Sequence, residues 1–386
     1  MSASTNLLIL GASTRAAAFS ALRAGLRPWC ADLFADADLE ARCEVIRIPP
    51  DQYPQGFVPI VARDLPGPWI FTGGLENRAG LVRKIAERRP LWGIGPRALA
   101  RVRSPQVLFW LFRRARLPRP AFWYKHRCDV PPGQWLVKPW AGAGGAGIRH
   151  WIGRRPTPAL LKSHYFQEFI EGKPCAAIYL GLARTALLLG VTRQLVGESW
   201  LHAAPFHYCG SVGPLRLSPA VREAFERLGT VLVERIHLRG LFGIDCVLRG
   251  NVPWPVEVNP RYTASVEVLE FAGNVPAMAL HRAVFDRQGP GIDLKPREPG
   301  PGVVGKAILF AHAPLIFPSD APWTATLCSP LPVDQMPDFA DIPHAGERIN
   351  KGRPILSFFV RADSEPACTG KLRAIARHLD RRLYGG

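Results

Sequence analysis

The stretch VKPWAGAGGAG, residues 137–147, holds four glycines in its last six positions. Each glycine in the interior of a strand costs about 0.5–1 kcal/mol relative to alanine, because it loses more backbone entropy on folding. An ordinary tight hairpin needs two glycines, so four of them make a costly turn. We therefore expect another molecule to approach this backbone closely.

The residues on either side of the glycines narrow the kind of loop. Gly142, Gly144 and Gly147 formally match GxGxxG, but that dinucleotide pattern requires a helix after it, and the alternating run IRHWIG predicts a strand. No GK[ST] follows the glycines, and the sequence has no HRD or DFG motif of protein kinases. The remaining interpretation is a hairpin whose N–H groups cover phosphates, with Lys138 reaching the same phosphates. The alternative is a plain structural turn.

A second informative stretch lies about a hundred residues downstream, where Asp245 precedes the run PVEVNPR. Alternate residues of a strand share a face, so Glu257 and Asn259 point together, and a turn at 250–251 folds Asp245 back against them. Two carboxylates and an amide oxygen on one face are the hard ligands that hold Mg²⁺. The alternative is a salt-bridge cluster in which Arg261 neutralises the acids.

Three parts are expected along the 386 residues. The run NLLIL, a small-residue turn and a helical stretch predict an α/β unit at the start of the chain. WIFTGG has the pattern of a second strand followed by a glycine turn. We therefore expect a small parallel-sheet domain over residues 1–98. Residues 99–290 combine helices with several short strand-like runs. A Pro/Gly-rich segment at 288–302 marks a boundary, after which 291–386 predict a mostly β segment with one closing helix.

Composition narrows the class of protein. The net charge is +18, but the basic residues are mostly arginine and no basic run interleaves with aromatic residues, so we expect small anionic partners and no nucleic acid. The start MSASTNLLILGAS predicts a strand rather than a signal peptide, and no stretch reaches the roughly 18–20 apolar residues of a membrane span. The eight cysteines lie apart without a CxxC pair. A soluble, cytoplasmic protein of open oligomeric state is expected.

These features, in this order, resemble the ATP-grasp superfamily. The chain has a small α/β unit, an LVKP lysine, a glycine-rich hairpin, a QEFIEG connection and then D…EVNPR, over roughly residues 1–290. The resemblance implies an α/β (α+β) fold, with a Rossmann-like N-terminal domain, two α+β subdomains that sandwich ATP, and a C-terminal mostly β segment.

The same resemblance implies roles for individual residues. Lys138 would contact the ATP phosphates, Arg261 would lie by the γ-phosphate or an acyl-phosphate, and Asp245, Glu257 and Asn259 would carry Mg²⁺ or Mn²⁺. The remaining ATP contacts would come from Gly142, Gly144, Gly145 and Gly147 and from Gln167, Glu168, Phe169, Ile170 and Glu171. Members activate a small-molecule carboxylate as an acyl-phosphate that an amine or thiol attacks, releasing ADP and phosphate. For this chain we expect a carboxylate–amine ligase.

Two departures from the family pattern motivate an alternative. Where members commonly have an earlier lysine, this sequence offers Arg101 or Arg103, and Pro174 stands where many have a ribose-binding glutamate, a role that Glu171 would take. The alternative is therefore a regulatory or scaffold protein that binds ATP with reduced catalysis.

A narrower resemblance points to ATP-grasp proteins of C1-carrier cofactor biosynthesis, near the tyramine–glutamate ligase group. It rests on NPRYTASVEVLE, GASTRAAAFSALRAG and IPHAGERINKGRPILSFFV. The tail also resembles the C-terminal segment of biotin carboxylases, but the acidic residue expected four positions after Arg261 is replaced by Ser265, which disfavours carboxylation.

Several other polar residues are candidates outside these motifs. Arg15 is expected at a mouth where a carboxylate could dock. Glu267 and Glu270 would orient an amine, be solvated or pair with Arg282, and His202 and His207 would border the acceptor site or be structural. Cys246 is expected to face the core.

Overall fold

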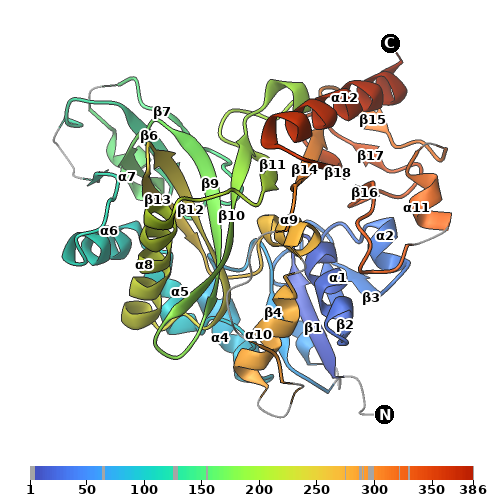
Figure 1. Cartoon of the computed structure of the whole chain (residues 1–386), viewed down its shortest axis with the longest axis horizontal. Coiled ribbons are helices and arrows are strands. Elements are labelled where there is room, and N and C mark those ends of the chain that lie inside the picture. Colours follow the sequence, from blue (N-terminus) through green and yellow to red (C-terminus); the bar gives the residue numbers. More distant parts are fainter. Residues whose placement is uncertain are drawn as a thin grey trace.

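The computed structural model describes residues 5–62, 66–124, 129–153, 155–273, 275–286, 289, 291–293, 300–320, 322–328 and 331–385, so most of the Pro/Gly-rich segment lies outside the described residues. The chain begins with a parallel sheet in the order β3-β2-β1-β4 (Figure 1). Its strands are β1 (Asn6–Gly11), β2 (Arg27–Asp32), β3 (Glu44–Arg47) and β4 (Trp69–Phe71).

Helices cover both faces of this sheet. Leu7 and Ile9 pack with α1 (Arg15–Arg23) and α10 (Ala277–Phe285), whereas Leu8 and Leu10 face α3 (Phe57–Val61) and α4 (Ala79–Ala86). Burial of a strand on both faces explains why β1 is an unbroken apolar run rather than an alternating one. The short helix α2 (Ala37–Glu40) follows β2.

A small antiparallel sheet carries the glycine run. The helices α5 (Pro96–Val102) and α6 (Pro105–Arg114) lead into strands ordered β5-β8-β6-β7, with α7 (Pro158–Ser163) before β8. These strands are β5 (Phe122–Trp123), β6 (Trp135–Pro139), β7 (Arg149–His150) and β8 (His164–Glu168). Because β6 pairs antiparallel with β7, the glycines form a hairpin loop, and the predicted absence of a following helix is confirmed.

The central sheet has the strand order β13-β12-β9-β10-β11-β14-β18-β16. The helix α8 (Pro219–Ile236) packs against β9 and β10 (Figure 1). The C-terminal segment expected over residues 291–386 contributes β14, β16 and β18 to this sheet. The strands are β9 (Lys173–Gly181), β10 (Ala186–Val196), β11 (Tyr208–Gly213), β12 (Gly240–Arg249), β13 (Val252–Asn259), β14 (Val303–Phe310), β16 (Phe339–Ala340) and β18 (Pro354–Ala362).

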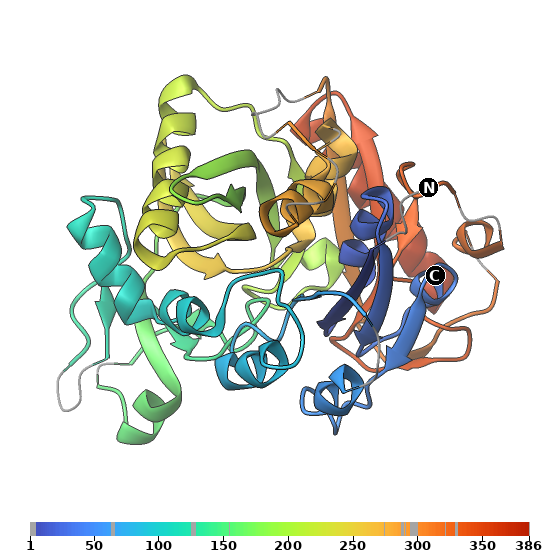
Figure 2. The same ribbon diagram turned by 90° about the horizontal axis from the view of Figure 1, so that it is seen from below.

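The remaining elements complete the chain. A 3₁₀ turn (Ser199–Leu201) precedes β11, and α9 (Ala264–Gly273) begins directly beyond β13. The C-terminal part adds α11 (Thr324–Cys328), a pair of short strands β15 (Leu315–Ile316) and β17 (Arg348–Ile349), and the closing helix α12 (Glu365–Tyr384). Figure 2 shows the blue N-terminal part beside the orange and red C-terminal part, with the teal segment on the opposite side of the molecule.

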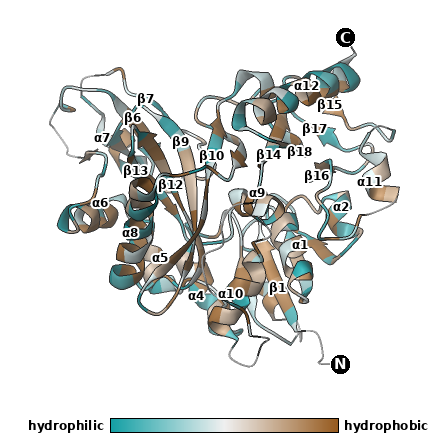
Figure 3. Ribbon diagram, in the orientation of Figure 1, coloured by the Kyte–Doolittle hydropathy of each residue, from teal (hydrophilic) through white to brown (hydrophobic). Residues whose placement is uncertain are grey.

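Hydropathy follows this architecture. Figure 3 shows hydrophobic residues gathered in the strands and on the inward faces of the helices, as burial of apolar surface requires. Among the described residues, none of the helices combines the length and the apolar character needed to cross a membrane.

Candidate active site

A cleft of about 540 Å³ lies between the small sheet and the central sheet. It brings together, from both sheets, most of the residues expected at the site. The lining includes Lys138, Gly144, Gly145, Gln167, Glu168, Phe169, Ile170, Asp245, Glu257, Asn259 and Arg261. Gly142, Gly147 and Glu171 are not part of the lining, whereas Pro174 is.

The acidic group forms as the hairpin predicted. Asp245 on β12 pairs directly with Glu257 on β13, and a bulge follows Asp245. The Asn259 side-chain amide donates to Asp245 Oδ2 at 2.9 Å, and Gln194 Nε2 donates to Asp245 Oδ1 at 3.0 Å. Four polar side chains from β10, β12 and β13 therefore converge on one face of the central sheet.

The two carboxylates are in different electrostatic situations. Burial, followed by the charge of Glu257, raises the pKa of Asp245 to about 6. Burial alone would also raise the pKa of Glu257, but Arg103 and Lys138 outweigh it and lower that pKa. A divalent cation between the two would relieve both the desolvation and the repulsion. The oxygens of Asp245, Glu257 and Asn259 thus fit a hard cation of the Mg²⁺ type.

Arg103 connects three parts of the site. Its guanidinium lies 2.6 Å from Glu257 Oε1 and donates to the Val258 carbonyl at 3.0 Å. It also donates to the Gly142 carbonyl at 3.1 Å and to Asn77 Oδ1 at 3.0 Å. Of the two arginines considered as replacements for the earlier lysine, Arg103 therefore reaches the acidic group, whereas Arg101 is exposed.

The glycine loop packs against the chain segment before β11. Gly145 has φ +85°, and a Cβ built there would lie 1.8 Å from the Phe206 carbonyl oxygen. Tyr208 donates its N–H to the Gly144 carbonyl at 3.1 Å. The four glycines predicted that another molecule approaches this backbone closely. At Gly145, the close neighbour is the Phe206 carbonyl of the same chain.

Lys138 and Gln167 point into the cleft from neighbouring strands. Both donate to the Val256 carbonyl, at 3.4 Å and 3.3 Å, and both are buried. The Gln167 Oε1 atom is buried and has no hydrogen-bond partner among the described residues. An unpartnered buried acceptor beside an ammonium group is suited to a polar ligand rather than to a closed core.

The connection after β8 offers a smaller set of backbone groups than expected. The N–H groups of Glu168 and Phe169 already donate to the carbonyls of Ala121 and Gln134, both at 2.9 Å. Among the described residues, no acceptor is found for the N–H of Ile170, which also lines the cleft. Ile170 can thus offer a backbone donor to a ligand.

Arg261 is oriented by an acid that the sequence reasoning missed. Glu76, from the loop after β4, is buried and accepts from Arg261 Nε at 2.9 Å, while Arg261 Nη2 lies 3.5 Å from Asn259 Oδ1. In the alternative of a neutralised salt-bridge cluster, Arg103 makes the direct ion pair with Glu257, and the charge of Arg261 also lowers the pKa of Asp245 and of Glu257. The only sequence signal for Glu76 is its place after Gly73-Gly74 at the carboxyl end of a parallel strand.

Comparison with known families fits this geometry. Residues 108–265 match the family model of the ATP-grasp domain. This range of the chain belongs to the ATP-grasp superfamily. The matched range covers the glycine hairpin, Lys138 and the strands of Asp245 and Glu257.

Curated relatives of this chain are distant. An uncharacterised protein of Methanocaldococcus jannaschii is 23% identical over 230 residues, covering 58% of this chain and 50% of that protein. A formate-dependent phosphoribosylglycinamide formyltransferase of Methylococcus capsulatus is 35% identical over 100 residues, 25% of this chain and 24% of that protein. The matches thus span about half of the first relative and about a quarter of the second.

Solved structures share the fold over nearly the whole chain. L-amino acid ligase of Bacillus licheniformis has a TM-score of 0.69 at 16% identity, covering 98% of each chain. A biotin carboxylase domain of Hydrogenobacter thermophilus 2-oxoglutarate carboxylase, in complex with MgADP, has a TM-score of 0.70 at 15% identity, over 95% of this chain and 88% of that one. N5-carboxyaminoimidazole ribonucleotide synthetase of Thermus thermophilus has a TM-score of 0.66 at 15% identity, over 98% and 99%.

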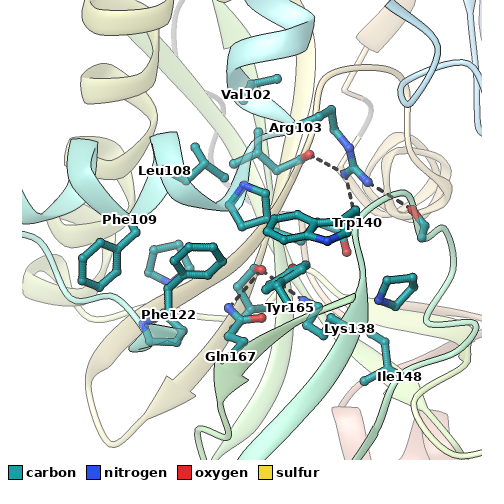
Figure 4. Close-up of a pocket in the computed structure, with 18 of the residues that line it drawn as sticks. Val102, Arg103, Leu108, Phe109, Phe122, Lys138, Trp140, Ile148, Tyr165 and Gln167 are labelled. Atoms are coloured by element: carbon teal, nitrogen blue, oxygen red, sulfur yellow. Dashed lines mark hydrogen bonds and ion pairs between the residues drawn. The ribbon is translucent and has the colours of Figure 1, made fainter. Parts of the chain in front are cut away.

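A second, aromatic pocket adjoins the ATP-grasp cleft. It is about 70 Å³ in volume and shares Lys138, Gln167 and Glu257 with the cleft. Figure 4 shows Lys138 and Gln167 in its lining. The Trp140 and Tyr165 rings, 5.0 Å apart, form part of its wall. Because this wall is apolar, it keeps the local dielectric low and strengthens the charge interactions of Lys138 and Glu257.

Three predictions about acids and bases outside the ATP-grasp motifs are wrong. Arg15 is fully buried and pairs with Glu267 and Asp341, so it is no open docking point for a carboxylate. Glu267 and Glu270 are buried rather than solvated, and Glu270 pairs with Arg23. Arg282 pairs instead with Asp286. The contacts of Arg15 with Glu267 and of Arg23 with Glu270 join segments about 250 residues apart, which no local pattern reveals.

The remaining candidates are His202, His207 and Cys246. His202 Nε2 lies 2.9 Å from Asp380 Oδ2 on α12, so it ties the segment before β11 to the closing helix. Neither His202 nor His207 lines the ATP-grasp cleft, although Phe206 does. Cys246 is buried, and its predicted place in the core is confirmed.

Proposed function

We propose that this chain is an ATP-dependent ligase that activates a small-molecule carboxylate as an acyl-phosphate for attack by an amine, with release of ADP and phosphate. The observation that carries the proposal is one cleft in which Lys138, the glycine loop and Arg261 face the pair Asp245 and Glu257. Phosphoryl transfer needs positioning and charge neutralisation more than covalent help from the protein. The fold shared with an L-amino acid ligase is consistent with this chemistry.

Each residue has a distinct proposed task. The ammonium of Lys138 and the N–H groups of Gly144 and Gly145 bind the phosphates, and Ile170 offers its N–H to the adenine. The remaining predicted contacts stay part of the proposal; they come from Gly142, Gly147, Gln167, Glu168, Phe169 and Glu171. Ribose binding has the least support among these contacts, because Pro174 stands where many members have a glutamate and Glu171 is not part of the cleft lining.

The acids and Arg261 serve the phosphoryl group. Asp245, Glu257 and Asn259 would hold Mg²⁺ or Mn²⁺, which when bound neutralises charge on the phosphates and orients them. Arg261, fixed by Glu76, points its guanidinium at the same place and stabilises the transferred phosphoryl group. The apolar wall beside Lys138 keeps water from a labile acyl-phosphate.

The test is Mg²⁺-dependent release of ADP from ATP with pooled amino acids and amines, in the wild type and in Glu257→Gln. The matched control is Glu44→Gln, because Glu44 is an exposed acid of the N-terminal sheet. The proposal expects release that needs the pool and is lost in Glu257→Gln but not in the control. Full activity of Glu257→Gln would contradict it, and tight ATP binding without release under any pool would favour the regulatory alternative.

Finer parts of the proposal concern substrates and organisation. Glutamate, tyrosine and tyramine belong in the pool because of the resemblance to cofactor-biosynthesis ligases. We propose residues 99–290 as the ATP-grasp domain, which contains the matched range 108–265, with 1–98 and 291–386 on either side. Splitting an active pool identifies the carboxylate and the amine.

A further inference from the structure

A cluster of three metal-ligating side chains lies near the end of the closing helix. Two are the histidines His202 and His312, and the third is Asp380 of α12. One ligand atom of each residue lies within 4.8 Å of the ligand atoms of the other two. None of the three lines the ATP-grasp cleft, so the cluster is a separate group of residues.

The three side chains come from distant parts of the sequence. His202 ends the 3₁₀ turn before β11, His312 follows β14, and Asp380 lies about one turn before the end of α12. These elements are neighbours, because β11 pairs with β14 and α12 packs against both (Figure 1). The fold therefore brings the three together, which explains why no spacing in the sequence marks them.

Two of the three residues already meet, and the third is held beside them. His202 Nε2 lies 3.0 Å and 2.9 Å from the two carboxylate oxygens of Asp380. The centres of the His202 and His312 rings are 4.8 Å apart. The backbone next to His312 is fixed, since the Ala313 carbonyl accepts from the Tyr384 hydroxyl at 3.2 Å, while the His312 side chain is exposed.

These separations suit a tetrahedral metal site. Two ligand atoms that are each about 2.1 Å from a Zn²⁺ ion stand roughly 3.4 Å apart in tetrahedral geometry. The His202–Asp380 separation of 2.9 Å is near that value, and the exposed His312 ring is the one that can turn to complete the site. Because solvent reaches His312, water can take the fourth position.

The types of ligand select the cation. Imidazole nitrogens suit Zn²⁺ and its neighbours among the transition metals, whereas Mg²⁺ prefers oxygen ligands. The cluster thus differs in kind from the acids and amide of the ATP-grasp cleft. Asp380 also lies near the C-terminal end of α12, where the helix dipole disfavours a lone carboxylate and favours a cation.

The loop that carries His202 also reaches the ATP-grasp cleft. Residues 197–207 form a closed loop, in which Gly197 donates its N–H to the His207 carbonyl at 2.8 Å. Phe206 of this loop lines the cleft, and its carbonyl is the group that a Cβ at Gly145 would meet. One short segment therefore joins the cluster to the surface on which the glycine hairpin rests.

The backbone of this loop is strained at both of its contact residues. His202 has φ +56° and Phe206 has φ +64°, in the left-handed region that residues with a Cβ rarely adopt. Such conformations persist where the surrounding structure holds them. Anchoring His202 to α12 therefore helps to keep Phe206 in its place.

We propose that His202, His312 and Asp380 bind a divalent transition-metal cation of the Zn²⁺ class, with water as the fourth ligand. The ion fastens the loop 197–207 and the end of β14 to the closing helix, and so fixes the surface on which the glycine hairpin rests. This site goes beyond the proposed ligase function and does not depend on it, because it shares no residue with the ATP-grasp cleft.

The binding test titrates Zn²⁺, and Co²⁺ as a spectroscopic probe, into the full chain in excess Mg²⁺, which occupies sites made of oxygen ligands. We expect one Zn²⁺ per chain by calorimetry. Bound Co²⁺ should show d–d absorption without thiolate charge-transfer bands, because the cluster has no cysteine. His312→Ala and Asp380→Asn should each lower the affinity for Zn²⁺ at least tenfold.

Asp380→Asn also separates a metal ligand from a hydrogen-bond partner. The asparagine keeps a side-chain oxygen that accepts from His202 but loses the negative charge that a cation needs. We therefore expect the melting temperature of the metal-free protein to stay the same while Zn²⁺ binding falls. A variant that loses stability without metal and keeps its Zn²⁺ affinity would show a hydrogen-bonded tie alone and overturn the site.

The matched control is His378→Ala, because His378 is an exposed histidine of the same helix outside the cluster. It should leave the Zn²⁺ affinity unchanged. No Zn²⁺ binding, equal losses in His378→Ala and His312→Ala, or thiolate absorption that is removed by substituting the exposed Cys328 with serine would each overturn the proposal.

Amide hydrogen exchange tests the effect on the loop. Zn²⁺ should slow exchange in residues 197–207 at least tenfold in the wild type and not in His312→Ala, with β3 of the N-terminal sheet as the internal reference. Bound Zn²⁺ that leaves exchange in this loop unchanged would overturn the fastening role. No readout here uses ATP, so failure of the ligase proposal would leave these results standing.

Discussion

The guanidinium of Arg103 lies 2.6 Å from the carboxylate of Glu257, at the point where a Mg²⁺ ligand is proposed. The same guanidinium holds the Gly142 carbonyl of the glycine loop. Arg103 therefore neutralises the acid and fixes the loop at once, and a bound metal ion would have to share Glu257 with it.

Arg103→Ala should weaken ATP binding about 10–100-fold, because Glu257 loses its counter-charge and the glycine loop loses a tether. Arg103→Lys should recover part of the affinity, since an ammonium group supplies the charge but cannot reach Glu257 and Gly142 together. Titration calorimetry with a non-hydrolysable ATP analogue measures both. Exposed Arg101→Ala is the control, and equal affinities in all four proteins would contradict this role.

Metal-dependent nucleotide binding should weaken in acid. Burial and the charge of Glu257 raise the pKa of Asp245 to about 6, so protons compete with the cation as the pH falls below that value. For one such group the loss approaches about tenfold in affinity per pH unit. Titrations with Mg²⁺ and nucleotide between about pH 5 and 8 should show this fall, and a flat profile would exclude Asp245 as a ligand.

Gly145→Ala should lower the affinity for ATP about tenfold or more. At φ +85° an L side chain costs about 1–2 kcal/mol, and its Cβ would collide with the Phe206 carbonyl, displacing the loop. Gly80→Ala is a matched control in α4, where nothing lies within 4 Å and the helix should gain about 1 kcal/mol. The KM for ATP and the melting temperature of both variants give the comparison.

Glu76→Gln should reduce kcat more than it changes the KM for ATP. Glu76 does not line the cleft but accepts from Arg261 Nε at 2.9 Å, so its loss would leave Arg261 in place with its guanidinium less well aimed. We expect a fall of about 10–100-fold in kcat, the range found when a supporting contact is lost. A variant that loses ATP affinity and keeps kcat would show that Arg261 serves ground-state binding instead.

Glu267→Gln should destabilise the protein by about 3–5 kcal/mol, because Arg15 and Lys306 would keep their buried charges with one acid fewer. These cations lower the pKa of Glu267 from 4.5 to about 2 against the effect of burial. Its contribution is therefore complete above the unfolded value of 4.5 and is lost as the pH falls towards 2. Urea unfolding at several pH values, with exposed Glu44→Gln beside it, tests the size and the sign.

Local patterns predicted the parts of the site that depend on strand geometry. The alternation of VEVN and the turn at 250–251 placed Asp245 opposite Glu257, because pairing within one hairpin is a local property. The strand after the glycines was likewise readable from IRHWIG. The contact between Gly145 and Phe206 joins residues about 60 positions apart. Its only signal in the sequence was the excess of glycines.

The wrong expectations concern charges whose partners are distant in the chain. Arg15 was expected at a mouth where a carboxylate could dock, yet it is buried and meets Glu267 of the middle part and Asp341 of the C-terminal segment. Glu76 had no motif of its own. Such pairs depend on how separate units dock, and a single sequence contains no signal for that docking.

The shared central sheet has a consequence for dissecting the protein. Because β11 pairs with β14, a fragment that ends near residue 290 would leave the β11 edge unpaired along Gly210–Gly213. An exposed row of N–H and C=O groups is a template for association with other chains, so such a fragment should self-associate. The last hundred residues thus act as the built-in cover of an aggregation-prone edge, and any study of the nucleotide site should keep them.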